Sequence, residues 1–304
     1  MLVALVPRLR LTVRTTLPPE GIVVPHRAIA WLFPLLLAGA AAGAETPEAL
    51  KLYVFDCGAI RFDDVASFGL SNQETPVREL FVPCYLIEHG SGGEVRRLLI
   101  DAGLPPDIAG QGEVEPEPGM RLAYARSLED QLADLGLAPA DVELVAFSHL
   151  HFDHVGSANL FAASTLLIQA PDFEAGFDDP DPRLFPMPLY AALKESPRVL
   201  LNGDHDVFGD GRVRLISAPG HTPGHQTLLL DLEETGPVLL SGDLYHFRES
   251  RALRRVPVFN SDADQTLASM TRIEALLEAE GATLWIEHDK ALADTLRKAP
   301  AFYR

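Results

Sequence analysis

The chain has 304 residues, 47% of them hydrophobic, which is enough for one large domain or two smaller ones with a real core. Its formal net charge is −18 at pH 7, and a surface this acidic repels phosphate backbones, so the composition argues against nucleases and any other nucleic-acid partner. The sequence has no repeat of the solenoid type.

The first 44 residues have the composition of a secretory signal peptide. Arg27 precedes the apolar stretch 28–37, which is too short to span a bilayer, and small residues follow as far as Ala44. We therefore expect a signal peptide over 1–44 and a single mature domain over 45–304 that is periplasmic or secreted, with no stable membrane insertion after cleavage. An uncleaved membrane anchor is the alternative.

The two cysteines, Cys57 and Cys84, would reach an oxidising compartment on export, where they could form a disulfide. Pairing requires Cα atoms within about 7 Å, which a sequence does not reveal. Because each cysteine adjoins an apolar, β-rich run, we expect two small buried hydrophobic residues in preference to a disulfide.

Short apolar runs predict strands along the whole domain. They cover residues 52–55, 85–87, 97–101, 142–147, 165–168, 198–201, 212–216, 227–232, 238–240 and 283–286. Four of them are followed by His or Asp residues, at 149–154, 221, 243 and 288. Because the carboxyl ends of strands are where layered α/β folds build their sites, we expect these side chains to meet.

Two helices are predicted between the strands. The first covers 127–135 and ends at Gly136. The second covers 263–280, with Asp262 as its N-cap and an apolar stripe at helical spacing. Residues 110–120, rich in Gly, Pro and Glu, are expected to form a loop.

Two long connections are candidates for pocket walls. Phe62, Phe68 and Leu70 lie between the first two predicted strands, where they either line a pocket or simply pack on the sheet. The proline-broken loop 178–188 could overhang the site.

The strongest pattern is the cluster of ligand-type residues directly after the strand predicted at 142–147. On an extended backbone His149 and His151 point to the same side, and Asp153 and His154 follow after a turn. Three imidazoles and a carboxylate this close together remain poorly solvated unless a cation gathers them, and zinc accepts such ligands. The pattern therefore predicts a metal site. A further loop, 219–225, adds His221 and His225, and spacing alone leaves open which of the two is a ligand.

Together these segments resemble the metallo-β-lactamase superfamily, whose α/β fold is a four-layer αββα sandwich. Its four motifs occur here in order: Ser-His-Leu-His-Phe-Asp-His at 148–154, Pro-Gly-His-Thr-Pro-Gly-His at 219–225, Ser-Gly-Asp at 241–243 and Glu-His-Asp at 287–289. The resemblance implies two zinc ions, although other divalent transition metals would suit the same donors. One ion would be held by His149, His151 and His221, the other by Asp153, His154 and His288, with Asp243 bridging both. His225 would then not bind metal but would be a loop residue that supports the ligands.

Within the superfamily, Asp243 favours the hydrolases with a bridging carboxylate over true β-lactamases. The segment 244–249 lacks the Gly/Arg-rich sequence that glyoxalase II enzymes use for glutathione. The remaining group, which the stretches 54–58, 82–87 and 242–247 resemble, is that of the N-acyl homoserine lactonases. The resemblance implies a small-molecule lactone or ester substrate, whose ester bond is opened by a hydroxide bridging the metals. It also implies that the chain can form a homodimer, because dimerisation is common in this group.

Catalytic roles follow from the same resemblance. Asp153 would orient the nucleophile besides binding metal, and Asp243, the bridging ligand, would be the second catalytic carboxylate. Members of the group place a tyrosine three residues after the bridging Asp, where this chain has His246 and has Tyr245 one residue earlier. Either His246 takes over the hydrogen bond to substrate, or Tyr245 reaches in through a shifted loop. The alternatives in function are another hydrolase of this fold (arylesterase, phosphotriesterase or β-lactamase), a non-catalytic zinc domain and a di-iron relative.

Overall fold

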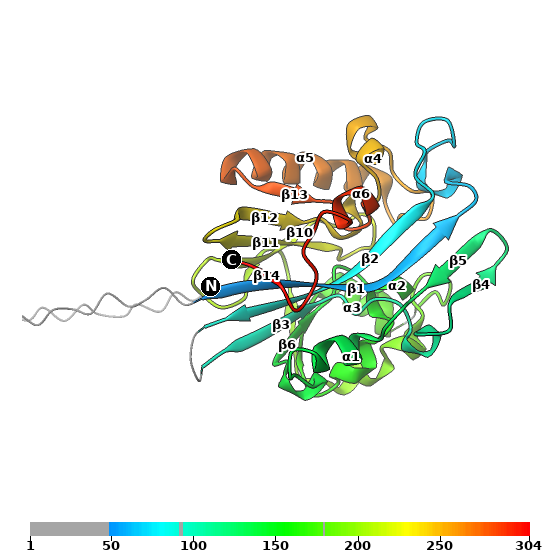
Figure 1. The fold of residues 1–304 in the computed structure, drawn as a ribbon. Helices are drawn as coiled ribbons and strands as arrows, with labels where there is room; N and C mark the ends of the chain where they lie inside the picture. The colour runs from blue at the N-terminus through cyan, green and yellow to red at the C-terminus, as the bar shows by residue number, and fades with distance from the viewer. Residues whose placement is uncertain (1–48, 91–93, 179) are drawn as a thin grey trace, which may run out of the picture. The chain divides into compact units, whose positions relative to one another are not determined.

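Two β-sheets lie face to face in the computed structural model, which describes residues 49–90, 94–178 and 180–304 (Figure 1). The larger sheet has the order β4-β5-β1-β2-β3-β6-β7-β8, with β14 also paired to β1, and the smaller has the order β13-β12-β11-β10-β9. The strands of the larger sheet are β1 (Leu50–Phe62), β2 (Glu79–His89), β3 (Arg96–Ile100), β4 (Glu113–Glu117), β5 (Met120–Ala123), β6 (Leu144–Ala146), β7 (Thr165–Gln169), β8 (Arg198–Leu201) and β14 (Phe302–Tyr303). Those of the smaller sheet are β9 (His205–Asp206), β10 (Val213–Ser217), β11 (Gln226–Leu232), β12 (Gly236–Leu240) and β13 (Thr283–Trp285).

The helices are α1 (Leu128–Ala133), α2 (Phe152–Val155), α3 (Ala170–Phe177), α4 (Arg248–Leu253), α5 (Ala263–Glu280) and α6 (Lys290–Ala293). Helices α1 and α3 cover the outer face of the larger sheet and α5 covers that of the smaller sheet (Figure 1), whereas Ala293 of α6 packs into the layer between the sheets. The apolar stripe of α5 packs on β11 and β12, and its first turn is capped by Asp262, whose carboxylate accepts from the Gln265 N–H at 2.9 Å. Among the described residues, no helix is both long and apolar enough to cross a bilayer.

The hydrophobic core is divided by the two sheets. Along β1, Leu52 and Val54 point into the layer between the sheets, whereas Tyr53 and Phe55 point into the layer under α1 and α3. This alternation follows from the two-residue repeat of a strand, and both faces are apolar because both are covered. The order helix, sheet, sheet, helix confirms the predicted four-layer αββα sandwich. The predicted signal peptide, 1–44, and its boundary lie outside the described residues.

Two expectations about the first half of the domain are wrong. The segment 110–120 is not a loop throughout: β4 and β5 form a hairpin there that pairs with the end of β1, with Ile60 opposite Leu122. The cysteines are not unpaired, because Cys57 and Cys84 form a disulfide between β1 and β2, with Cα atoms 5.8 Å apart. Both cysteines are nevertheless fully buried, as expected.

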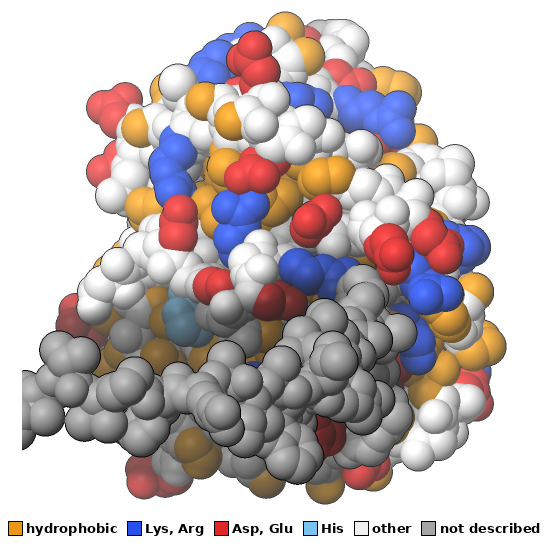
Figure 2. All heavy atoms as spheres, turned by 90° about the vertical axis from the view of Figure 1, so that its left-hand side faces the viewer, with side chains coloured by type: hydrophobic (Ala, Val, Ile, Leu, Met, Phe, Trp, Pro, Cys, Tyr) orange, Lys and Arg blue, Asp and Glu red, His pale blue; other side chains and the backbone are white. Residues whose placement is uncertain are grey.

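Charged side chains of both signs cover the surface of the domain. On the face seen in Figure 2, Asp and Glu side chains alternate with Lys and Arg side chains across the described surface. Ion pairs among the described residues include Arg214 with Glu280 at 2.8 Å and Arg272 with Asp204 at 2.6 Å. The acidic side chains that give the protein its negative net charge therefore do not form a single patch on this face.

Candidate metal centre

The ends of four strands, from both sheets, converge at one edge of the sandwich. β6 leads to His149 and His151 and then to α2, which carries Asp153 and His154, while β10, β12 and β13 lead to the later motifs. The expectation that these strand ends meet is confirmed. All seven predicted ligands are buried in the interior: His149, His151, Asp153, His154, His221, Asp243 and His288.

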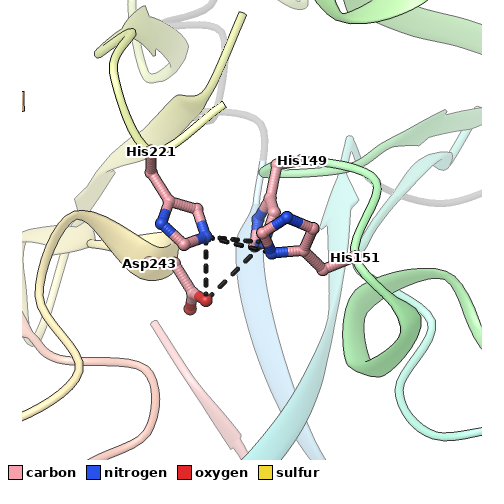
Figure 3. A group of neighbouring side chains, drawn as sticks. All are labelled: His149, His151, His221 and Asp243. Carbon is pink, nitrogen blue, oxygen red and sulfur yellow. Dashed lines mark hydrogen bonds and ion pairs between the residues drawn. The ribbon is translucent and has the colours of Figure 1, made fainter. Parts of the chain in front are cut away.

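Three imidazoles and one carboxylate point toward a common centre (Figure 3). The Nε2 atom of His149 and the Nδ1 atom of His151 lie 2.8 Å apart, and the Nε2 atom of His221 lies 3.1 Å from each. The Oδ2 atom of Asp243 lies 3.6 Å from His149 Nε2 and 3.3 Å from His221 Nε2. Donor atoms of a tetrahedral zinc site, at bonds of about 2.0–2.1 Å, are about 3.3 Å apart. The first cluster thus has the spacing that such an ion requires.

The outer nitrogens of His149 and His221 have protein partners, which leaves their inner nitrogens for a metal; the Nδ1 atom of His149 lies 3.0 Å from Ser148 Oγ. The Nδ1 atom of His221 lies 2.9 Å from Asn260 Oδ1, an acceptor, so His221 donates there and presents an Nε2 lone pair. Burial, reinforced by the neighbouring imidazoles, lowers the pKa of His149 and His151 well below the ordinary value. Both rings are therefore neutral at pH 7, the form that binds metal.

The second cluster consists of Asp153, His154 and His288. The Oδ1 atom of Asp243 lies 3.4 Å from His154 Nε2 and 2.8 Å from His288 Nε2, and the Oδ2 atom of Asp153 lies 3.7 Å from each of these nitrogens. The two oxygens of Asp243 thus face different clusters. This is the position of a bridging carboxylate.

Several buried polar atoms at the centre lack a hydrogen bond to any residue that the structure describes. They include the Nε2 atom of His154, and also the Nε2 atom of His288 and the Oδ1 atom of Asp243, which lie 2.8 Å apart without forming a hydrogen bond. Buried polar groups in folded proteins are almost always paired, so a set of unpaired nitrogen and oxygen donors directed at one point fits divalent cations. The residues present therefore match the metal pair that the family resemblance implies.

Two buried carboxyl groups, those of Asp101 and Glu287, lie beside the metal-ligand candidate His154, and neither was predicted as a site residue. The Oδ2 atom of Asp101 lies 3.0 Å from His154 Nδ1, and its carboxylate also accepts from the backbone N–H of Ser148 at 2.7 Å. Burial and the neighbouring Asp101 raise the pKa of Glu287 well above its usual range, which favours its protonated form. A signal for Asp101 existed, since it is the last residue of the strand predicted at 97–101 and ends that strand with a carboxylate.

His225 is not a member of either cluster. Its Nδ1 atom donates to the Ala218 carbonyl at 3.0 Å, and its Nε2 atom accepts from the backbone N–H of Asp243 at 3.0 Å. Burial, with the nearby His221, lowers the pKa of His225 to about 3, which keeps it the neutral acceptor that Asp243 requires. His225 thus fixes the backbone of Asp243, as the family resemblance implies.

His246 and Tyr245 point to opposite sides of the chain, because the backbone is extended at this point. The Nε2 atom of His246 lies 3.0 Å from Asp243 Oδ2, and the ring packs against Phe68 at 5.0 Å between centroids. The Tyr245 hydroxyl instead donates to Glu274 on α5 at 2.8 Å. Tyr245, predicted as a catalytic alternative, is therefore not brought into the site, whereas His246 is.

A cavity of about 840 Å³ opens onto the two clusters. Phe62 and Phe68 line it, so the pocket-lining alternative holds for them, whereas Leu70 is buried in the core under the larger sheet. The loop predicted at 178–188 lines this cavity through Pro182, Arg183, Leu184 and Pro186. Asp153, Asp243, His246 and His288 form the polar end of this cavity.

Comparisons with known proteins agree with this geometry. Residues 77–280 match the profile of the Metallo-beta-lactamase superfamily. The N-acyl homoserine lactonase AttM of Rhizobium johnstonii is 30% identical over 84% of this chain and 98% of its own length, and the N-acyl homoserine lactonase AiiA of Bacillus thuringiensis subsp. kurstaki is 26% identical over 83% and 98%. A solved N-acyl homoserine lactone hydrolase with the product N-hexanoyl-L-homoserine at its catalytic metal centre superposes with a TM-score of 0.70 at 25% identity, over 84% of this chain and 100% of that one. The chain therefore belongs to the metallo-β-lactamase superfamily and is an enzyme whose histidine and aspartate side chains form a metal-binding centre.

Proposed function

We propose that this enzyme hydrolyses the ester bond of N-acyl homoserine lactones with two bound zinc ions. The observation that carries the proposal is Asp243, which faces both ligand clusters at the polar end of a cavity. The similarity to N-acyl homoserine lactonases over almost their whole length supports the choice of substrate.

One set of residues would bind the metals, and a second, partly overlapping set would contact water and the substrate. His149, His151 and His221 would hold one ion, Asp153, His154 and His288 the other, and Asp243 both. When bound, such a pair of divalent cations activates water at neutral pH and polarises a carbonyl oxygen. Asp153 borders the cavity, so its carboxylate can also orient water toward the ester.

His246 is the side chain best situated to hydrogen-bond the substrate carbonyl. It lines the cavity beside Asp243, and Phe68 and Phe259 pack against its ring at 5.0 and 5.9 Å between centroids. A donor held in one orientation by its neighbours stabilises developing negative charge without reorganising during the reaction. It would thus take the role that the lactonase group gives to a tyrosine at this position.

Substitution of the two neighbouring residues tests this assignment. His246→Ala should lower kcat about a hundredfold with metal content unchanged, because one oxyanion donor is lost. Tyr245→Phe should leave kcat nearly unchanged, because the hydroxyl bonds Glu274 outside the cavity. The opposite pattern in steady-state kinetics would return the role to Tyr245.

The function itself is tested with the purified zinc-loaded enzyme. Proton release should accompany the opening of N-acyl homoserine lactones, with elemental analysis giving two zinc ions per chain. His205→Ala, on edge strand β9 and outside the cavity lining, serves as the control and should behave as the unsubstituted enzyme. If only an aryl ester, a phosphotriester or a penicillin is turned over, the enzyme belongs to another branch of the superfamily.

We also infer that the protein is exported. The disulfide between Cys57 and Cys84 supports this, because such bonds persist in oxidising compartments, and residues 1–44 have the composition of a signal peptide. N-terminal sequencing of protein from periplasm and medium should find a chain that starts at residue 45. A full-length chain confined to the cytoplasm would contradict the inference.

A further inference from the structure

A second cavity, of about 660 Å³, lies apart from the metal centre. Among the described residues, none that lines it also lines the cavity at the metal ligands. It is bordered by α4, α5, α6 and the end of β13, which lie together in the upper part of Figure 1, and β13 is the outermost strand of the smaller sheet. Ligand sites in proteins commonly have volumes in this range, and the proposed lactonase reaction makes no use of this cavity.

The polar part of the second cavity is rich in arginine. Arg248 and Arg251 are three residues apart on α4 and therefore share one face of the helix, and Arg254, which follows the helix, lines the cavity beside them. The carboxylates of the lining belong to Glu274 and Asp289. Three guanidinium groups and two carboxylates leave the cavity with one net positive charge, although the whole chain carries −18. An otherwise acidic protein therefore attracts anions at this place.

The three arginines are held in place by bonds that do not use all of their donors. Arg251 donates through Nε and Nη2 to the Glu274 carboxylate, both at 2.7 Å. Arg248 donates through Nε to Asp289 at 2.5 Å, and Arg254 donates through Nη2 to a carbonyl and a hydroxyl of α5, at 2.7 and 2.9 Å. Because a guanidinium group has five N–H donors, each of the three retains donors for a ligand.

Arg254 has a backbone conformation that favours glycine. Its φ and ψ are 51° and 48°, at the C-cap of α4. Among the described residues other than glycine, only Asp101, beside the metal-ligand candidate His154, also has a positive φ. Glycine ends a helix in this conformation at a lower energetic cost than arginine does. Because such strained residues cluster at functional sites, the presence of arginine here favours a role for its side chain.

The rest of the second cavity is largely apolar. Leu284 and Ile286 are two residues apart and so lie on the same face of β13 and its continuation, and Leu292 of α6 adds to this wall. A ligand with one negative charge neutralises the cavity, and an aliphatic part covers the wall. A phosphate dianion would leave the cavity negative and the wall uncovered. The lining therefore matches a monoanion with a hydrocarbon chain.

We propose that the second cavity binds aliphatic carboxylates, with the carboxylate at Arg251 and Arg254 and the hydrocarbon chain on the wall formed by Leu284, Ile286 and Leu292. Two sources supply this chemistry. One is a free short-chain fatty acid. The other is the ring-opened product of the proposed reaction, because hydrolysis of the ring ester yields a carboxylate where the lactone has no charge. Only this second source rests on the proposed function.

Calorimetric titration of the zinc-loaded enzyme with hexanoate tests the site. Arg254→Gln should weaken hexanoate binding at least tenfold, because a charged donor is lost, and Arg254→Gly should do the same while relieving the backbone at this position. Any hexanoate bound at the zinc ions remains in both variants, since Arg254 lies outside that cavity. Arg272→Gln, which removes an equal charge from the pair with Asp204 outside the second cavity, is the control and should bind as the unsubstituted enzyme does.

Two further ligands test the chemical class. Hexanamide, which has the same chain without the charge, should bind at least tenfold more weakly than hexanoate, and so should inorganic phosphate. Tighter binding of phosphate at the Arg254-dependent site would overturn the assignment to carboxylates. Equal hexanoate affinity and stoichiometry in the unsubstituted enzyme and both Arg254 variants, with circular dichroism showing the native fold, would overturn the site itself. Neither result depends on turnover of a lactone, so failure of the lactonase proposal is detected separately.

Titration with N-hexanoyl homoserine distinguishes the two sources. If the product occupies the second cavity, the unsubstituted enzyme should bind one molecule at the metal centre and one more that Arg254→Gln removes. If Arg254→Gln leaves the binding of this product unchanged but weakens that of hexanoate, the cavity is a site for free fatty acids, and product binding there is overturned.

Discussion

Asp243 is the residue on which the metal centre depends most, because its two oxygens face different ligand clusters. Other ligands belong to one cluster each. Its backbone is fixed by His225 and its carboxylate lies near His246, so ligand, support and substrate-facing side chain meet at one position.

Asp243→Ala should therefore empty both sites together. We expect loss of most bound zinc and a fall in kcat of about a thousandfold or more, because the activating cations depart with the shared ligand. Metal content by elemental analysis and lactone hydrolysis should fall in parallel. A metal-free Asp243→Ala enzyme with full activity would end the two-metal account.

Asn260 is a positioning residue that only the structure identifies. It accepts from His221 Nδ1 and donates to Thr266 Oγ1 at 2.8 Å, which fixes the ring whose Nε2 atom faces the first cluster. Asn260→Ala should weaken zinc binding about ten- to a hundredfold, as losses of such supporting bonds do. Asn260→Asp keeps the acceptor and should restore most of the affinity in competition with a chelator. Equal zinc affinity in all three proteins would show that the contact does not orient His221.

At the level of elements, the loop that carries His221 is held by α3. The Asp172 carboxylate, on α3, accepts from the Thr222 hydroxyl at 2.8 Å and from the Gly224 N–H at 2.5 Å. Burial raises the pKa of Asp172 from its ordinary value of 3.8 to about 6, although these hydrogen bonds act in the opposite direction. The folded protein therefore holds this proton more tightly than the unfolded chain does.

The sign of this shift gives a pH dependence. The stability associated with protonated Asp172 is present below about pH 4 and is lost as the pH rises through about 6. Because an amide does not titrate, the stability of Asp172→Asn relative to the unsubstituted protein should increase by about 2–3 kcal/mol between pH 4 and pH 7. Urea unfolding at the two pH values measures this difference. A constant difference would mean that Asp172 titrates normally in the fold.

The disulfide joins β1 to β2 across the long connection between them. The cysteines are 27 residues apart, and closing a loop of this length stabilises a fold by about 3.5 kcal/mol in the chain-entropy account. The Cys57→Ala/Cys84→Ala variant should lose about that much in free energy of unfolding by denaturant titration. It should keep its zinc and its turnover at 25 °C, because neither cysteine belongs to a ligand cluster. Unchanged stability would mean that the bond contributes nothing to the fold.

Over the whole molecule, the sequence predicted best what is locally encoded. The four ligand motifs follow strands with clear apolar patterns, and the helix over 263–280 has the predicted bounds. The β4–β5 hairpin was missed because a Glu- and Pro-rich segment acquires strand structure only by pairing with β1, some 60 residues away. Asn260 gave no signal because its partner, His221, is distant in sequence. The choice between Tyr245 and His246 depends on the direction of the backbone after Asp243, which spacing does not specify.

The ligands are spread from His149 to His288, and β13, which leads to the last of them, is among the later strands to be made. A nascent chain therefore leaves the ribosome with its first histidines exposed long before the final one exists. The two proposed metal sites would be completed only after synthesis, and the divalent cation that is most available where folding finishes would then have an advantage in filling them. If the same polypeptide folded in another compartment, it would then bind a different metal although its sequence was unchanged.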